Sequence, residues 1–431
     1  MIKQVALMES VSSNVHQFLQ QIGTNLSRPD KKFLRDGFLG LLRAGKPIVC
    51  QMARRMPDHR AKFLSRRDRL EEHLTQESDF DQRVYRALPS VWLPYVRQDT
   101  PIILDLSDLA KPLATEMDYL ATVRDGNTGE LVNGYWVVEI YASVSRKNPI
   151  PVLLRPFSHE QPECAGQNPV VLDAVHQIFA LTDNRGVLVV DRGFDGRIMF
   201  DHWLDNGYRF VARLRGDRHI QAFFADSGDF GSPEGPGRRG SWVCIEERLL
   251  ADRTPTPHRW SKLIKRRGRP NLRITQVGWV KIRLPGRCEI LTMVVSRLAG
   301  RDIPLMLLTN LPVENVKDAR RVLRYYARRW ECEEAIRFLK LQVDLEKIRT
   351  FRWTAICRLA LLAMLVMIYL GSVVEADPKL CDRLIRFGEP LPDKPDFLFY
   401  RLLTGLGELL DSCFWTHREL LTRRLRKKPT V

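Results

Sequence analysis

The sequence contains no Cys-x-x-Cys pair, and its eight cysteines are not spaced with histidines in any metal-ligand pattern. This excludes the common structural zinc sites, which need closely paired thiolate and imidazole ligands. Widely scattered cysteines also do not indicate a disulfide framework. We therefore interpret them as small buried hydrophobic side chains in a reducing compartment.

Long hydrophobic runs are also scarce. The first ten residues have no apolar core long enough for a signal peptide. The longest apolar run, Leu359 to Val374, has 16 residues, with Arg358 before it and Asp377-Pro378 after it. Because a membrane-spanning helix needs about 20 apolar residues, we expect a buried core helix and a cytoplasmic, nucleoid-associated protein. A membrane-associated protein anchored by this run is the alternative.

Acidic residues are too few to balance the basic ones: 51 Asp and Glu face 68 Lys and Arg, which gives a net charge of +17. Such a surplus favours a polyanionic partner, with nucleic acid ahead of an acidic membrane surface. The content of 44% hydrophobic and 28% charged residues is typical of a globular chain. A length of 431 residues suggests about three domains.

The stretch from Tyr326 to Lys340 sorts into two stripes when wound as a helix. At about 100° per residue, one arc of roughly 100° collects aromatic, cationic and acidic side chains: Tyr326, Arg329, Trp330, Glu333, Arg337 and Lys340. The opposite side is apolar. A carboxylate among cations suits a site that binds a metal ion and a phosphate backbone. A solvated helix with charge pairs is the alternative.

Two further acids follow apolar runs. Asp105 ends Pro101 to Leu104, and Asp191 ends Gly186 to Val190. Both runs are typical of buried strands followed by turns, with Ser107 and Asp108 in the first turn. The end of a central strand is where an α/β sheet presents its chemistry.

Together these residues resemble the DDE transposases of bacterial insertion sequences, in the branch with a Tyr-x2-Arg-x3-Glu-x6-Lys signature. Tyr326, Arg329, Glu333 and Lys340 meet that spacing without a gap. The motifs Asp-Leu-Ser-Asp at Asp105 and Asp-Arg-Gly-Phe-Asp at Asp191 match the two aspartate motifs of the family. The resemblance extends from about Asp105 to Arg349.

The resemblance implies an α/β fold with a ribonuclease-H-like catalytic core and metal-dependent cut-and-paste transposition. Asp105, Asp191 and Glu333 would hold two Mg²⁺ ions, with Mn²⁺ able to substitute. The expected partner is double-stranded DNA, as the terminal inverted repeats of the element and as target, bound by a homodimer. The residues expected to contact DNA are Tyr326, Arg329, Trp330, Arg337 and Lys340, with the indole stacking on an extruded base.

Rival residues exist for some of these roles. Asp108 and Asp195 compete with the two aspartates, and we expect Asp195 to cap the following helix. Glu334 is expected to pair with a neighbouring cation. Relatives carry a second tryptophan where this chain has Leu305, so Trp279 or Trp260 would have to replace it.

The pattern along the chain predicts five segments, and the resemblance implies their roles. They are a helical segment (1–95), the first part of the catalytic core (96–214), a β-rich insertion (215–302), the second part of the core with one signature helix from about Glu314 to Val343 (303–376), and a basic helical C-terminal region (377–431). The resemblance implies that 1–95 is a DNA-binding domain, and an ordinary helical cap with a solvated face is the alternative. In the insertion, Ser241 to Leu249 is expected to be a strand and Trp260 to Arg273 a flexible basic loop that binds phosphates. The alternative for Arg267-Gly268-Arg269-Pro270 is a minor-groove hook, which its sequence resembles. Gly235 to Gly240 fits Gly-x-Gly-x-x-Gly but is not expected to bind a nucleotide.

The second functional hypothesis is a domesticated or decayed copy that only binds DNA. All the named positions are intact, which argues against it. The two hypotheses differ in whether element-end DNA is cut.

Overall fold

The structure is a computed structural model that describes residues 2–57, 61–145, 147–225, 240–266, 269–388 and 397–411. It is a mixed α/β chain that divides into two compact units. The first contains Met1–Arg97, Asp105–Thr182 and Glu331–Val431, and the second contains Gln98–Leu104 and Asp183–Trp330. Each unit is therefore assembled from segments far apart in the sequence. The expected domain boundaries stay predictions.

Helices fill the first 95 residues, as predicted. They are α1 (Ile2–Ile22), α2 (Arg28–Ala44), α3 (Val49–Arg55), α4 (Phe63–Thr75), α5 (Phe80–Ala87) and α6 (Pro89–Trp92). In α2, the Ser27 side chain accepts a hydrogen bond from the Asp30 amide and caps the first turn. Gly45, at φ 65°, ends the helix by donating its amide to Leu41. Phe38 and Leu41 are buried, which fixes the inward face of the helix.

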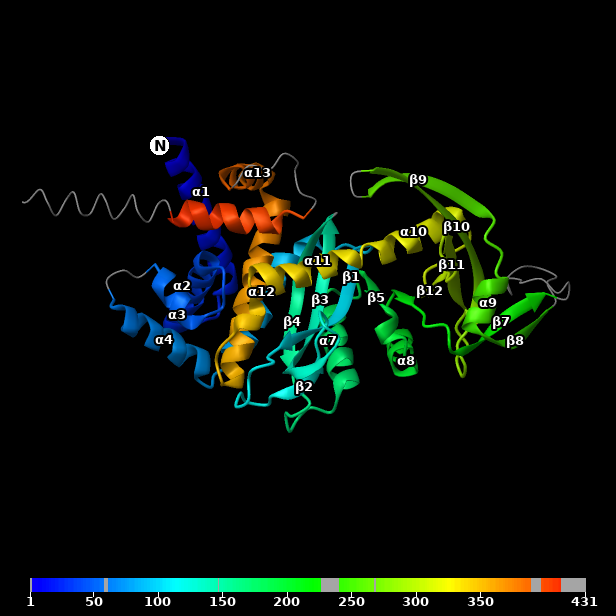
Figure 1. Cartoon of the computed structure of the whole chain (residues 1–431), viewed down its shortest axis with the longest axis horizontal. Helices are drawn as coiled ribbons and strands as arrows, with labels where there is room; N and C mark the ends of the chain where they lie inside the picture. The colour runs from blue at the N-terminus through cyan, green and yellow to red at the C-terminus, as the bar shows by residue number, and fades with distance from the viewer. Residues whose placement is uncertain are drawn as a thin grey trace, which may run out of the picture. The chain divides into compact units, whose positions relative to one another are not determined.

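The apolar run predicted to be a core helix forms α12 (Trp353–Ala376). Among the described residues, α12 is the one helix apolar and long enough to span a membrane, and 89% of its apolar window is buried inside the protein. It packs on β4 (Asn148–Phe157) and on α2 and α4 (Figure 1). This burial is that of a core helix. α13 (Pro378–Phe387) follows, residues 399–411 are helical, and the basic tail beyond 411 lies outside the described residues.

The sheet of the first unit has the order β2 (Ala121–Arg124), β3 (Leu131–Ser145), β1 (Pro101–Ala110), with β4 paired to β3. The predicted strand pair at Gly134 to Val144 and Pro149 to Phe157 is confirmed by β3 and β4, and the predicted helix by α7 (Gln167–Leu181). One prediction was wrong. β1 does not stop at Leu104 but continues through Asp105, Ser107 and Asp108, because the second half of β1 gains β3 as a neighbour.

The first residues of β1 belong to the second unit, where they pair in parallel with β5 (Val187–Val190). Ile103 lies opposite Val189. On its other side β5 pairs in parallel with β6 (Phe210–Arg213), after the short helix α8 (Arg197–Asp205). The predicted strands at Val187 to Val190 and Tyr208 to Leu214 are thus both present.

Beyond β6 the second unit is antiparallel and rich in strands. The order continues with β12 (Leu305–Thr309), β11 (Leu291–Leu298), β10 (Arg269–Arg283), β7 (His219–Ala225) and β8 (Gly240–Glu246), and β9 (His258–Arg266) pairs with β10. α10 (Val316–Ala327) contacts β10 and β6 (Figure 1).

Two details of the segment 215–302 differ from expectation. The strand predicted to reach Leu249 ends at Glu246, and α9 (Glu247–Arg253) follows because the buried Glu247 carboxylate accepts the Gly216 amide and pairs with Arg218. Trp260 to Arg273 is not a loop but a strand pair, with Trp260 opposite Thr275. Residues 267–268, and residues 235–239 of the glycine-rich stretch, lie outside the described residues.

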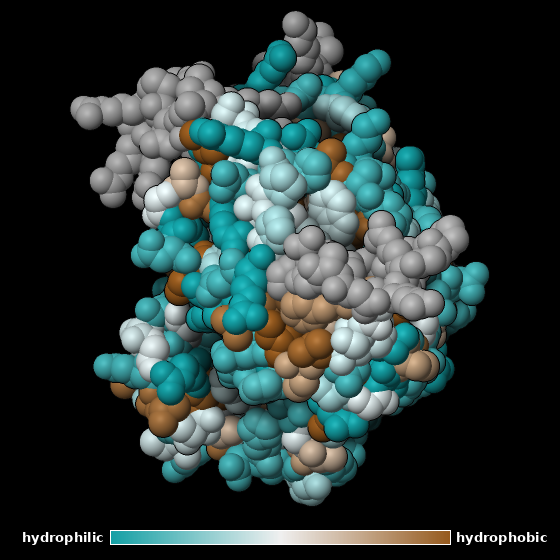
Figure 2. Space-filling model, turned by 90° about the vertical axis from the view of Figure 1, so that its right-hand side faces the viewer, coloured by the Kyte–Doolittle hydropathy of each residue, from teal (hydrophilic) through white to brown (hydrophobic). Residues whose placement is uncertain are grey.

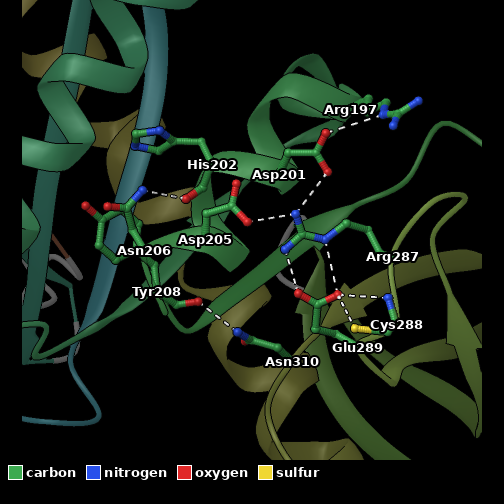
Figure 3. A network of polar contacts seen from close by, with 10 residues as sticks. All are labelled: Arg197, Asp201, His202, Asp205, Asn206, Tyr208, Arg287, Cys288, Glu289 and Asn310. Carbon is green, nitrogen blue, oxygen red and sulfur yellow. Dashed lines mark hydrogen bonds and ion pairs between the residues drawn. The ribbon is translucent and has the colours of Figure 1, made fainter.

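A polar network ties α8 to the connection between β10 and β11 (Figure 3). The Arg287 guanidinium lies 2.7 Å from the Asp205 carboxylate and 2.6 Å from that of Glu289. These charge-assisted bonds, led by those to Glu289, raise the pKa of Arg287 and keep it charged. The network fixes α8, the helix that follows Asp191, within its unit.

The face shown in Figure 2 is mostly hydrophilic, with apolar side chains in several places, including a group near its centre. In the second unit, β7, β8 and α9 border an apolar hollow of about 410 Å³, lined in part by Phe224, Val243 and Leu249. Val243 and Leu249 are both exposed. The strand-rich part of this unit therefore presents apolar as well as basic surface.

Candidate functional site

Asp105 lies in the middle of β1 and is half-buried. Its Oδ1 accepts the Leu106 amide at 2.9 Å, and its Oδ2 lies 3.3 Å from the Cys332 thiol, which donates to it. Cys332 is in α11 (Trp330–Arg337) and directly precedes Glu333. The structure thus brings Asp105 to the helix that carries the predicted glutamate.

The signature segment is not the single helix that we expected. α10 ends at Ala327, α11 begins at Trp330, and a π-helical turn at Phe338–Gln342 follows. Tertiary contacts accompany the break before α11: the Glu331 side chain accepts hydrogen bonds from the Ser143 hydroxyl and from the Lys147 amide at 3.1 Å, which holds α11 on β3. π-helical turns inside helices are frequent at functional sites. Glu333 is half-buried on α11.

Lys340 and Arg337 lie in different surroundings. The Lys340 ammonium is 2.8 Å from the Asp108 carboxylate and 3.1 Å from that of Glu346. Burial lowers the pKa of Lys340, but the two carboxylates more than offset this, and the pKa is raised overall. Lys340 therefore does not lie on an open basic face. Its ammonium group compensates the charge of Asp108, which is buried. Arg337 is exposed and pairs with Glu334 at 3.1 Å, as predicted for Glu334.

Asp191 lies in the second unit, directly after β5. Its Oδ1 accepts the Gly193 amide at 2.7 Å and caps a short turn, Arg192–Phe194. The rival Asp195 does not cap α8, contrary to our expectation, since the N-cap of that helix is Gly196. Asp195 is instead buried, accepts the Arg215 amide at 2.6 Å and pairs with Arg218.

Tyr326, Arg329 and Trp330 cluster in the second unit. The Arg329 guanidinium lies 5.9 Å from the ring centre of Tyr326 and 5.7 Å from that of Trp330. Tyr326 is buried, whereas Trp330 is 63% exposed. An exposed indole beside a guanidinium presents a flat surface on which a base can stack.

The two candidate substitutes for the second tryptophan also lie in the second unit. Trp279 stacks on His258 at 5.3 Å, and Trp260 lies under the Arg320 guanidinium at 4.4 Å. Leu305 is the first residue of β12.

Sequence patterns did not identify Glu139, a carboxyl group on β3 that is 2% exposed. It accepts hydrogen bonds from the Ser107 and Tyr141 hydroxyls. Burial raises its pKa to about 7, and the nearby Asp105 charge adds to this increase. The available signal was a single acid within the apolar strand Gly134 to Val144.

Carboxylate oxygens are the ligands that Mg²⁺ and Mn²⁺ prefer, so the chemistry of Asp105, Asp191 and Glu333 fits a divalent cation. Within the described part of the chain, no group of three or more His, Cys, Asp or Glu residues is arranged to hold an ion. The first unit by itself places Asp105 beside α11, and the second unit by itself places Asp191 at the end of the strand paired to β1.

Residues 162–369 match the family model described as "Transposase DDE domain". The matched range includes Asp191 and the whole signature from Tyr326 to Lys340, and it begins after Asp105. No curated protein matches the chain.

Solved structures also match the chain. One is described as "Cryo-EM structure of piggyBac transposase synaptic complex with hairpin DNA", with 13% sequence identity, a TM-score of 0.42, and coverage of 91% of this chain and 73% of that one. A TM-score of 0.42 is too low to support a conclusion about fold or function.

The family match agrees with the resemblance inferred from the aspartate and signature motifs. The family implies nuclease and transesterase chemistry with a divalent metal. Residues 162–369 are therefore similar to the DDE domain of transposases.

Proposed function

We propose that this protein is the transposase of a bacterial insertion sequence, which cuts the element from DNA and pastes it into a target. The observation that carries the proposal is the unbroken Tyr-x2-Arg-x3-Glu-x6-Lys spacing inside the segment that matches the DDE domain family. The ribonuclease-H-like architecture of the catalytic core is part of this proposal.

We propose that Asp105, Asp191 and Glu333 converge on the bound cations. Strand register supports this: each aspartate follows two residues after the last paired position, Ile103 opposite Val189, of the parallel strands β1 and β5. The contact of Cys332 with Asp105 supports the contribution of α11. Neighbouring parallel strands that carry acids just beyond their last paired residues, approached by a helix with a third acid, are suited to this arrangement.

Two Mg²⁺ ions bound there would activate a water or a 3′-hydroxyl and stabilise the departing oxygen of a phosphodiester. The chain's own residues would position the DNA. Arg329 can bind a phosphate through two parallel hydrogen bonds, and Trp330 can stack on an extruded base. Lys340 would bind phosphate by exchanging its contact with Asp108.

The proposed partner is double-stranded DNA, as the inverted repeats of the element and as its target. A homodimer would bind it, because two ends must be paired. The charge of +17 supports an affinity for phosphate that falls steeply with salt. The protein would act in the bacterial cytoplasm at the nucleoid.

The direct test is cleavage of element-end DNA by the full chain with Mg²⁺ or Mn²⁺. We expect Glu333→Ala to lower the cleavage rate by about 10³-fold or more, because the loss of one ligand removes transition-state stabilisation of several kcal/mol. Glu334→Ala is the matched control, since Glu334 pairs only with surface Arg337 in the described contacts. Cleavage by Glu333→Ala at the rate of the unaltered protein would refute the assignment.

The same assay addresses the alternative, a catalytically inactive or domesticated relative that binds DNA. Binding of element ends without cleavage by the unaltered protein would support that alternative.

A further inference from the structure

Glu139 is a buried acid whose two oxygens are both held by hydroxyl groups. Ser107 on β1 donates to Oε1, and Tyr141, two residues along β3, donates to Oε2. Glu139 is 2% exposed and Tyr141 is fully buried. Since β1 and β3 are neighbours in the sheet, the Ser107 contact joins the two strands through their side chains.

A buried carboxyl group is costly unless a cation or several donors compensate it. The charges that act on Glu139 are those of Asp105, which is also an acid, and of Lys340, which pairs with Asp108 and Glu346. No cation is among the hydrogen-bond partners described for Glu139. Stability alone is therefore a poor explanation for an acid at this position, and acids in such surroundings are frequent at functional sites.

The position of Glu139 relative to Asp105 follows from strand geometry. Side chains two residues apart point to the same face of a strand, so Ser107 and Asp105 share one face of β1. α11 meets this region twice, through Cys332 to Asp105 and through Glu331 to Ser143. Glu139 therefore lies beside Asp105 and is attached to the same strand.

The pairing of β3 with β4 is irregular at this point. It shifts register between Ile140 and Tyr141, directly after Glu139, and the extra residue is Val152 of β4. Such bulges are over-represented next to active sites, where they redirect a side chain. Here the shift accompanies the approach of the Tyr141 hydroxyl to Glu139.

A similar contact at the far end of β3 offers a comparison. The Ser145 hydroxyl donates to Glu375 of α12, which also accepts from Asn148 at 2.7 Å. This is again a serine of a strand bound to a carboxylate, but it involves neither β1 nor α11. It provides a matched control for the contact between Ser107 and Glu139.

We propose that Glu139 is a positioning residue for Asp105 in divalent-cation binding: by holding Ser107 it fixes the part of β1 that presents the Asp105 carboxylate toward α11. This inference rests on the proposed function, because it takes Asp105 as a cation ligand. Residues that orient the ligands of a metal site typically contribute 10- to 100-fold to metal affinity.

The test is Mn²⁺ binding by the full chain without DNA, measured by electron paramagnetic resonance of the free ion. We expect Ser107→Ala and Glu139→Ala each to weaken binding by about 10-fold. Glu139→Gln keeps an acceptor oxygen for the serine and should recover most of the affinity. Ser145→Ala should bind Mn²⁺ like the unaltered protein.

Asp105→Ala distinguishes a failure of the positioning role of Glu139 from a failure of the proposed cation site. If it loses Mn²⁺ affinity while Ser107→Ala and Glu139→Ala do not, the positioning role is wrong and the proposed site stands. If Asp105→Ala also binds as the unaltered protein does, the proposed site itself is wrong. Thermal melting identifies a variant that fails to fold, and if Glu139→Ala is one, the Ser107→Ala result decides.

Discussion

At the scale of single residues, the buried Glu139 carboxyl group should make folding pH-dependent. Burial raises its pKa in the folded protein to about 7, whereas an unfolded chain has a glutamate pKa of about 4.3. Between these values the folded state binds more protons than the unfolded state. The contribution of Glu139 to stability is therefore complete below about pH 4.3 and is lost as the pH rises to about 7.

We predict that Glu139→Gln flattens this dependence, because the amide does not titrate. Urea unfolding at pH 5 and pH 7 measures this dependence. As the pH rises, the free energy of unfolding of the unaltered protein should fall by up to about 1.4 kcal/mol per pH unit more than that of the variant. Parallel curves for the two proteins would show that the folded-state pKa of Glu139 is not raised.

Short fixed spacings made some candidate residues predictable. Asp191 and the signature from Tyr326 to Lys340 could be proposed as candidates from the sequence because their pattern is local. The partners of these residues were not found, since they depend on tertiary contacts. Lys340 is separated from Asp108 by 232 residues, and Glu139 from Ser107 by 32, so no local pattern indicates that either pair meets.

At the scale of elements, the buried side chain of Arg358 adds polar contacts to the packing of α12 against the N-terminal helices. Arg358 is 1% exposed and donates to the Asp81 carboxylate at 3.0 Å, to the Gln76 carbonyl at 2.7 Å and to the Ser78 hydroxyl at 2.9 Å. Its guanidinium thus satisfies acceptors in the connection between α4 and α5. Burial raises the pKa of Asp81, and the pairing with Arg358 opposes this.

We predict that Arg358→Met lowers the free energy of unfolding by about 3 to 5 kcal/mol, because it leaves a partly buried carboxylate and several acceptors without their donor. Chemical denaturation measures the change. Arg352→Met is the control, since Arg352 is exposed just before α12, and it should change stability by less than about 0.5 kcal/mol. Equal, small effects of both variants would contradict this role of Arg358.

Periodicity predicted the existence of elements better than their limits. The apolar run predicted α12, and the alternating runs predicted β3 and β4, because these patterns reflect burial directly. The predicted end of β1 was wrong because Asp105 and Asp108 lie within the strand, where partners on other elements bind their carboxylates. The break between α10 and α11 was missed for a similar reason, since Glu331 binds β3.

At the scale of the whole molecule, the mixed α/β class was predictable and the assembly of the units was not. Composition and element order indicate the class. However, each unit joins segments far apart in sequence, and β1 contributes to both. The boundary also passes through the signature, with Trp330 in one unit and Glu331 in the other.

The central claim, that the acids of both units share bound cations, can be tested directly with Fe²⁺ in place of Mg²⁺. With ascorbate and peroxide, bound Fe²⁺ generates hydroxyl radicals that cut the nearby backbone, and mass spectrometry locates the cuts. We predict cuts near Asp105, Asp191 and Glu333 together, all suppressed by excess Mg²⁺. Cuts near fewer than three of them, or cuts that Mg²⁺ does not suppress, would contradict a shared cation site.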